Sequence, residues 1–534
     1  MGDAPSRAKC HSIIFPDIVT TPPTTALPWW RDRLLIGVAI VFGGWSLLSL
    51  SWPLSGDAGV FAWMADTVHR GGAPYVDSWD TKGASAWLPS LLVENIFGRT
   101  GWGIRLFDIA MVLSALAAMR SIARRLGQPG DGRVAIALYA LWYASLDFWH
   151  SAQPDGWVAS WLVIACWCAL TANIAGIFAA GVLVGLATLV KPFYLGYVVV
   201  LWIIVATSRS SERRIRMTHG ALVTLGVAAG SGAVLLLTAH WRGLDGFWEV
   251  QRWNRDVYAR LGDPWLTRIP AIFKGALIMP WGIVAPIALF GSIRPTRQHR
   301  RTIAALTVGF LGAVAGVMLQ GKGWMYHWLP MLPFLALLAD IGFASLRAET
   351  AGEIAGRFRF LALTLALVVA AITPLQQFYR YVRSRGSAER IANYEQHEFR
   401  YYGRNPGSVY SIVDSLRSLA PDTARILVWA MHPAPQYLAG LHIATRYAVI
   451  RPLYDGAGTE ERARYRADFV REMTAAPPRW WLLPTPALLA EEEELRGNRI
   501  EAFPAAVNML HAEYRVADTT PQWIVYERKT QSGQ

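Results

Sequence analysis

The sequence contains little cysteine and relatively few acidic residues. Only three cysteines occur among 534 residues, and two of them, Cys166 and Cys168, are too close together in one apolar run to bridge each other easily. This excludes a disulfide framework and a metal site built on sulfur. Asp and Glu number 38 against 51 Lys and Arg, which gives a formal net charge of +13. The basic residues cluster in short loops between apolar runs, a pattern that is typical of membrane proteins and argues against nucleic-acid binding.

Several signatures of soluble enzymes are also absent from the sequence. It has no glycine-rich phosphate loop after a strand, no Cys/His spacing that suits a metal, and no nucleophile elbow. No internal repeat of fixed period occurs either. The sequence therefore offers no site for a cytosolic reaction that depends on a nucleotide.

Long apolar runs, in contrast, are frequent. A membrane helix needs about 20 mostly apolar residues, and the mean hydropathy of +0.26 is too low for a chain that lies wholly in lipid. We therefore predict a membrane module together with a soluble domain. A polar tail over 1–32 precedes the first run, and because no small-residue cleavage pattern follows that run, we expect a retained helix instead of a cleaved signal peptide. The eleven predicted membrane helices cover 34–52, 102–121, 133–149, 156–172, 174–190, 193–207, 218–239, 267–290, 303–319, 327–345 and 359–376.

The loops between these runs predict the orientation of the chain. With eleven helices threaded, the loops rich in Lys and Arg all lie on one side of the membrane, which the positive-inside rule makes the cytoplasmic side. The tail 1–32 lies on this side too, whereas the first outer loop 53–101 and everything after about 377 lie on the other side. The basic loops are 120–133, 208–216, 294–301 and 347–359.

The outer regions carry two further patterns. Residues 53–101 and 240–262 contain amphipathic segments that we interpret as helices in the membrane interface, and a plain exposed loop is the alternative for the second. Beyond residue 385, strand-like runs alternate with helical spacing, which predicts a small α/β domain over 377–534 after a membrane module over 33–376. The expected strands are 424–431, 446–454, 479–485 and 521–528, and the expected helices are 408–420 and 459–475.

Ionisable residues at the outer ends of the membrane helices are candidates for function, because such groups are costly to place near lipid. Asp57 follows the first apolar run, and the same loop continues to Asp80 and Lys82 in YVDSWDTKG. A carboxylate that takes a proton from an incoming hydroxyl, beside a lysine that neutralises a phosphate leaving group, is what transfer from a sugar phosphate requires. The alternative is structural: Asp57 would cap a helix that begins near residue 58.

Asp155 and Lys191 lie at the ends of two further predicted membrane helices. Asp155 begins an apolar helix, where it would either cap that helix or stand opposite Asp57 across a cavity and share acid–base work or a divalent metal. Lys191 is a lone cation before Pro192, where it would either snorkel to the interface or contact an anionic lipid headgroup.

Two clusters of aromatic and basic residues complete the candidates. The segment GKGWMYHWLPMLP places Lys322, Tyr326 and His327 at a helix mouth, and a Trp/Tyr belt with an incidental histidine is the alternative. The segment QRWNRDVYAR offers Arg255 and Tyr258 as partners for a phosphate or for sugar hydroxyls.

These motifs resemble the GT-C superfamily of integral membrane glycosyltransferases, in particular its bacterial branch of protein mannosyltransferase-like, aminoarabinose transferase-like and rhizobial galacturonosyltransferase-like enzymes. The first outer loop of that family reads roughly Asp-Glu-Gly, Gly-x-x-Pro-Tyr and Trp-Asp-x-Lys, and this chain has GDAG, GGAPY and WDTKG. LATLVKP is similar to the family's Thr-Lys-Pro element, and MYHWLPMLPFLALL is similar to its His-Tyr segment. The chain departs from the pattern at Ala58, where an acid is usual, and at Gly83 and Ala84, where Pro-Pro is commoner.

The resemblance implies a GT-C fold and a role for each matched residue. Asp57 corresponds to the catalytic base, Asp155 to a second acid, and Lys82 and Lys191 to residues that face the donor phosphate. We expect the remaining candidates to bind substrate, namely Tyr75, Asp80, Lys322, Tyr326, His327, Arg255 and Tyr258.

The resemblance also implies partners and a location. The donor would be a sugar on a polyprenyl phosphate, and the acceptor a glycan, lipid or protein of the cell envelope. The enzyme would lie in the bacterial cytoplasmic (inner) membrane, with its C-terminal domain outside the cytoplasm. No cofactor is required, and because Ala58 replaces the usual second acid, a divalent metal at Asp57 and Asp155 stays open.

The predicted function is inverting sugar transfer, and two alternatives remain. A transporter or flippase would also have many helices and buried charges, but the acids lie at the outer edge of the helices and no repeated halves are visible. A polymerase or ligase would use a diphosphate-linked donor instead of a monophosphate.

Overall fold

The computed structural model describes most of the chain. The described residues are 29–128, 131–206, 213–261, 267–270, 274, 279–293, 300–322, 324–349, 353–387, 389–390, 393–394, 416–417, 425–430, 433–456, 458–491, 498–521 and 523–529. Most of the predicted tail 1–32, the middle of the predicted span 267–290 and most of the predicted helix 408–420 lie outside these residues.

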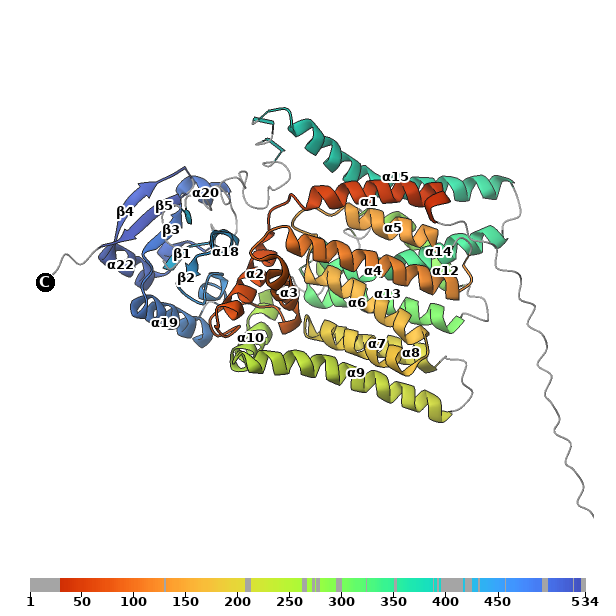
Figure 1. Cartoon of the computed structure of the whole chain (residues 1–534), viewed down its shortest axis with the longest axis horizontal. Helices are drawn as coiled ribbons and strands as arrows, with labels where there is room; N and C mark the ends of the chain where they lie inside the picture. Colours follow the sequence, from red (N-terminus) through yellow and green to blue (C-terminus); the bar gives the residue numbers. More distant parts are fainter. Residues whose placement is uncertain are drawn as a thin grey trace, which may run out of the picture.

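Apolar helices form one elongated bundle (Figure 1). Among the described residues, five helical stretches are long and apolar enough to cross a membrane: Trp102–Arg125, Arg213–His240, Arg300–Gln320, Met325–Leu346 and Phe360–Ser384. Each of the eleven predicted spans overlaps a helix of the bundle, which confirms a helical protein that passes the membrane several times. The helices are α1 (Arg33–Ser49), α4 (Gly103–Arg125), α5 (Arg133–Ala144), α6 (Pro154–Leu170), α7 (Ile174–Thr188), α8 (Tyr197–Ala206), α9 (Arg213–His240), α12 (Ala285–Ile293), α13 (Arg300–Gln320), α14 (Leu332–Glu349) and α15 (Glu353–Ser384).

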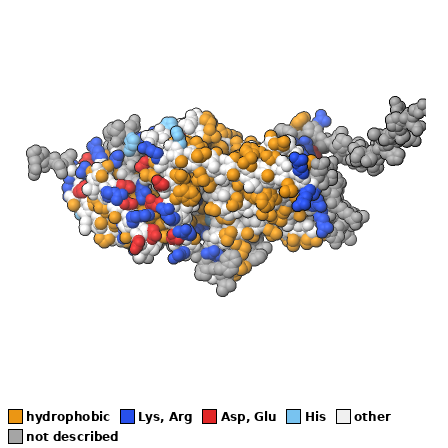
Figure 2. All heavy atoms as spheres, turned by 90° about the horizontal axis from the view of Figure 1, so that it is seen from below, with side chains coloured by type: hydrophobic (Ala, Val, Ile, Leu, Met, Phe, Trp, Pro, Cys, Tyr) orange, Lys and Arg blue, Asp and Glu red, His pale blue; other side chains and the backbone are white. Residues whose placement is uncertain are grey.

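The surface of the bundle matches a membrane environment. Figure 2 shows hydrophobic side chains along its middle and Lys and Arg side chains gathered at the end far from the C-terminal domain. Inside the bundle, α7 and α9 approach closely because Gly181 and Gly185 of one helix lie against Gly226 and Gly230 of the other. Small residues allow such backbone contact where lipid supplies no hydrophobic driving force.

Short helices lie between the bundle and the C-terminal domain (Figure 1). They come from the two regions that the sequence predicted to be amphipathic helices. They bring Lys82 of the loop 53–101 and Tyr258 of the loop 240–262 into the same cavity walls, and the candidate site is built there. These elements are α2 (Gly56–His69), η2 (Ala84–Ala86), α3 (Leu88–Phe97), α10 (Leu244–Asp256) and η4 (Tyr258–Leu261).

The C-terminal domain is an α/β unit, as predicted. Its sheet has the order β2-β1-β3-β5-β4, with β1 (Arg425–Val428) parallel to β2 (His442–Ile443) and to β3 (Trp480–Pro484). The strands β5 (Trp523–Arg528) and β4 (Tyr514–Thr519) are antiparallel to their neighbours. Its helices are α18 (Ala434–Ala439), α19 (Glu460–Ala475), α20 (Pro486–Glu491) and α22 (Pro504–Glu513), with short turns η7 (Arg451–Leu453) and η8 (Ile500–Ala502).

One predicted strand was wrong and two strands were missed. The segment 446–454 forms a loop and η7 instead of a strand, and its apolar residues are buried without pairing in the sheet. The strand β2 has only two residues, and β4 is exposed at all but its first position, so neither shows the alternation of apolar and polar residues that marks a half-buried strand.

Candidate active site

Two cavities lie side by side where the loops 53–101 and 240–262 meet the bundle. The larger, about 360 Å³, and the smaller, about 80 Å³, share Thr81, Lys82, Tyr258 and Tyr326 in their walls. The other residues around the larger cavity include Lys191, Phe193, Asn254, Arg255, Gln320, Lys322 and His327, and those around the smaller include Asp57, Asp80, Trp149, Trp324 and Arg451.

Asp57 stands in the first turn of α2 and does not cap it. The cap is Ser55, whose hydroxyl oxygen accepts a hydrogen bond from the Ala58 amide at 3.3 Å. The capping alternative for Asp57 was therefore wrong, and its carboxylate is available to the small cavity. Its Oδ1 lies 3.6 Å from Nζ of Lys82. Burial opposes the charged form of this lysine, but Asp57, Tyr326, Tyr258 and Asp80 together outweigh burial and raise the pKa of Lys82 well above its usual value.

Tyr75 and Asp80 hold the backbone of Lys82. The Tyr75 hydroxyl donates to the Lys82 carbonyl at 3.0 Å and accepts from Nε1 of Trp87 at 3.3 Å. The Lys82 amide donates to Oδ2 of Asp80 at 3.1 Å. Asp80 borders the small cavity, whereas Tyr75 is fully buried and borders neither of the two cavities. Both residues were expected to bind substrate, and the geometry gives Tyr75 a supporting contact instead.

Gly83 allows the loop that carries Lys82 to approach the end of α7, next to Lys191. A side chain at Gly83 would overlap the Leu189 carbonyl, so only glycine permits this approach of the loop to the end of α7. The Ser85 amide also donates to the Leu189 carbonyl, at 3.1 Å. The Gly that follows Lys82 in WDTKG thus brings Lys82 and Lys191 into the wall of one cavity.

Asp155 and Lys191 form a buried ion pair. Nζ of Lys191 lies 2.8 and 2.7 Å from the two carboxylate oxygens of Asp155, and it also donates to Oε1 of Gln320 at 2.5 Å. The Tyr194 hydroxyl donates to Asp155 at 2.6 Å. Gln153 occupies the cap position of α6, so Asp155 is not the cap. Its side chain is 1% exposed, and both oxygens are engaged, which suits it to fixing Lys191 more than to exchanging protons with a substrate.

Lys322 lies against the Tyr258 ring at the wall of the larger cavity. Its Nζ lies 2.8 Å from the centre of the Tyr258 ring, and it has no hydrogen-bond partner within the part of the chain that the structure describes. Burial, and after it the charges of Arg451 and Lys82, lower the pKa of Lys322 to about 6. An anion in the larger cavity would relieve this cost.

The remaining candidates differ in position. Tyr326 and His327 both border the larger cavity, and the Tyr326 ring lies 5.8 Å from Nζ of Lys191. Arg255 also reaches the cavity wall, but it is 72% exposed and paired with Asp256 at 2.8 Å.

The sequence did not point to two residues of these walls. Gln320 ends α13 and bonds Lys191, and Arg451 comes from η7 of the C-terminal domain, with its guanidinium 5.3 Å from the centre of the Tyr258 ring. Gln320 directly precedes GKG, which could have drawn attention to it. Nothing in the sequence marks Arg451, because it stands in the segment that was taken for a strand.

The donor set does not fit a divalent metal. Asp57 and Asp155 each have a lysine ammonium beside them, which repels a second cation, and Lys191 bonds both oxygens of Asp155. No group of three or more His, Cys, Asp and Glu side chains suitable for a metal occurs among the residues that the structure describes. We derive no step that passes through a metal.

Comparison with known proteins gives a partial family match. Residues 84–233 match the dolichyl-phosphate-mannose-protein mannosyltransferase family. No curated protein sequence matches the chain.

Solved structures share the architecture at low sequence identity. ArnT from Cupriavidus metallidurans bound to undecaprenyl phosphate is 14% identical, with a TM-score of 0.61 over 93% of this chain and 98% of that one. The Archaeoglobus fulgidus oligosaccharyltransferase is 12% identical, with a TM-score of 0.52 over 92% of this chain and 72% of that one. The arabinofuranosyltransferase AftD from Mycobacteria is 12% identical, with a TM-score of 0.51 over 94% of this chain and 40% of that one. The chain therefore has the GT-C fold, the fold of the superfamily of integral membrane glycosyltransferases that its sequence resembles.

Proposed function

We propose that the chain is a glycosyltransferase that moves a sugar from a polyprenyl-phosphate donor to a hydroxyl of an envelope glycan, lipid or protein, on the extracytoplasmic face of the inner membrane. The observation that carries this proposal is the pair Asp57 and Lys82, 3.6 Å apart where two cavities meet. A base for the acceptor and a cation for the leaving group stand side by side.

The larger cavity suits a lipid phosphate. Lys82, Lys191 and Lys322 line it, and a bound phosphate would favour the protonated form of Lys322 as well. Val190 and Phe193 give the same cavity an apolar wall, which a prenyl chain can contact. The family that matches residues 84–233 is named for a dolichyl-phosphate donor, and ArnT was solved with undecaprenyl phosphate, which supports this choice of donor class.

The smaller cavity suits the reaction itself. A carboxylate oxygen of Asp57 takes the proton from the acceptor hydroxyl, whose oxygen then forms a bond to the anomeric carbon from the face opposite the phosphate. The bond between that carbon and the phosphate oxygen breaks, and the electron pair leaves with the polyprenyl phosphate. Lys82 stabilises the negative charge that develops on this oxygen, and the anomeric configuration inverts.

Asp155 takes a positioning role in this scheme. Tyr194 bonds Asp155, and Asp155 holds Lys191 in one orientation. The ammonium therefore faces the phosphate before the donor binds, and no side-chain entropy is lost on binding. This replaces the role of second acid that the resemblance implied for Asp155.

The test supplies purified protein in vesicles with a labelled polyprenyl-phosphate sugar and fractionated envelope glycans, lipids and proteins as acceptors. The proposal predicts a labelled glycosidic product together with release of polyprenyl monophosphate, seen by mass spectrometry, and loss of both in D57N. Release of a diphosphate would instead indicate a ligase or polymerase. Label that crosses the vesicle membrane without a new bond would indicate a transporter and contradict the proposal.

A further inference from the structure

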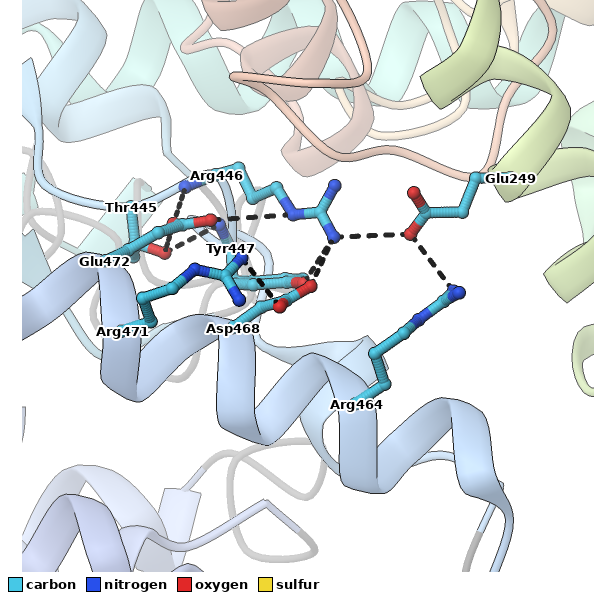
Figure 3. A network of polar contacts seen from close by, with 8 residues as sticks. All are labelled: Glu249, Thr445, Arg446, Tyr447, Arg464, Asp468, Arg471 and Glu472. Atoms are coloured by element: carbon cyan, nitrogen blue, oxygen red, sulfur yellow. Dashed lines mark hydrogen bonds and ion pairs between the residues drawn. The ribbon is translucent and has the colours of Figure 1, made fainter.

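Arg446 connects the C-terminal domain to the loops that carry the candidate site. It lies between β2 and η7, and its side chain is only 10% exposed. Figure 3 shows its guanidinium at the centre of a polar network that reaches across to α10. Nη2 donates to Oε1 of Glu249 at 3.2 Å and to Oδ2 of Asp468 at 3.1 Å, and Nε lies 3.6 Å from Glu472.

The Glu249 contact fixes α10, and α10 fixes the segment that carries Lys82. Glu249 belongs to α10, five residues before Asn254. Nδ2 of Asn254 donates to the Thr81 carbonyl at 2.6 Å. The arginine is therefore connected to the residue before Lys82 by one ion pair, one helix and one hydrogen bond.

A second connection runs through the backbone of the same arginine. The Arg446 carbonyl accepts a hydrogen bond from the Trp79 amide at 2.9 Å. The Trp79 ring is fully buried and packs between Trp253 of α10, at 4.9 Å between ring centres, and Tyr465 of α19, at 6.0 Å. Both connections end on residues 79–81, immediately before the lysine.

We propose that Arg446 is a positioning residue: the C-terminal domain uses it, through Glu249 and the Trp79 amide, to hold Lys82 against Asp57 and the donor phosphate. The assignment rests on the proposed function, since it needs Lys82 to contact that phosphate. It gives the C-terminal domain a part in donor binding in addition to covering the cavity.

Glu249 offers a cleaner test than Arg446. Removing the arginine would leave Asp468 and Glu472 without their shared cation inside the domain, and the domain could fail to fold. The substitution E249Q removes the two ion pairs that Glu249 makes with the domain, to Arg446 at 3.2 Å and to Arg464 at 3.3 Å. R464Q removes the second pair alone, so it should keep the wild-type affinity if Arg446 carries the effect. R471Q is the matched control, because Arg471 pairs with Asp468 at 2.7 Å within α19, is 71% exposed and makes no contact with α10 in that network.

The experiment measures binding of undecaprenyl phosphate to the purified full chain in detergent, so that it does not depend on knowing the acceptor. We expect E249Q to weaken binding about tenfold with an unchanged thermal midpoint, and R471Q to stay within about twofold of wild type. E249Q introduced into a K82A background should add no further loss of binding, because the contact acts through Lys82. A stabilising contact unrelated to Lys82 would lower binding by the same factor in both backgrounds.

The outcomes separate the two proposals. If wild type binds the lipid phosphate and E249Q binds it equally well, or if the losses from E249Q and K82A multiply, the role of Arg446 is overturned and the proposed function stands. If wild type itself does not bind a polyprenyl phosphate, the proposed function fails, and the role of Arg446 fails with it.

Discussion

Nζ of Lys191 lies 2.7 Å from the carboxylate of Asp155, in a pair that is almost closed to solvent. A buried ion pair contributes little to stability as a whole, but removing one member leaves the other charge uncompensated. In the proposed function, the pair sets where a positive charge stands beside the larger cavity.

Removing Asp155 alone should be costly. We expect D155N to lower the free energy of unfolding by about 3 kcal/mol, because the Lys191 ammonium stays buried without its partner. The double variant D155N/K191M should recover most of this loss, since neither charge remains. Chemical denaturation followed by tryptophan fluorescence measures both. A single variant as stable as wild type would show that the pair is not held as described.

The lowered pKa of Lys322 predicts that donor binding depends on pH. Its pKa of about 6 means that it is largely neutral at pH 7 in the free protein. An anionic phosphodiester next to it favours the ammonium form, so binding takes up a proton at pH values above 6. Donor affinity should therefore fall as the pH rises from 6 to 8, up to about tenfold per unit, and level off below 6.

The control for this dependence is K322Q, which cannot titrate. It should bind the donor more weakly at pH 6 than wild type and show a much flatter profile between pH 6 and 8, measured by titration with a polyprenyl-phosphate sugar. The groups that act on Lys322 are Arg451, Lys82, Asp455 and Lys191. An identical slope in wild type and K322Q would assign the dependence to one of these groups and contradict the prediction.

Removing the Arg105 side chain, which lies outside the two cavities, should lower the stability of the fold. Its guanidinium, on α4, donates to Oγ of Ser151 and to the carbonyls of Pro53 and Phe148, the last two at 2.8 Å each. Since these partners lie in the first two outer loops, R105M should leave buried acceptors without a donor and lower stability by about 3 kcal/mol. R124A removes only a half-exposed pair with Asp131 and should cost less than about 1 kcal/mol. Equal losses in the two variants would contradict the prediction.

The sequence predicted the parts of the site that lie in contiguous motifs. The motifs GDAG and WDTKG contain Asp57 and Lys82, and Lys191 was recognisable because a charged residue is rare between apolar runs. These positions follow from local rules: a helix of the length of a membrane span is expected to end at the membrane surface, and polar residues are expected at its end.

What could not be predicted depends on contacts between distant segments. Arg446 and Glu249 are separated by 197 residues, and neither carries a local signal beyond its charge. The pairing of Asp155 with Lys191 could have been anticipated only from which helices are neighbours. The false strand over 446–454 has the same cause, because its apolar residues are buried by tertiary packing where the sequence alone favours a strand.

In the proposed mechanism, Asp57 is the base that activates the acceptor. The most direct measurement compares wild type and D57N for two quantities in the same preparation: the rate of sugar transfer and the affinity for the polyprenyl-phosphate donor. We predict that transfer falls by at least about a thousandfold, while donor affinity changes by less than about threefold, because Lys82, Lys191 and Lys322 remain. Transfer by D57N at the wild-type rate would contradict it.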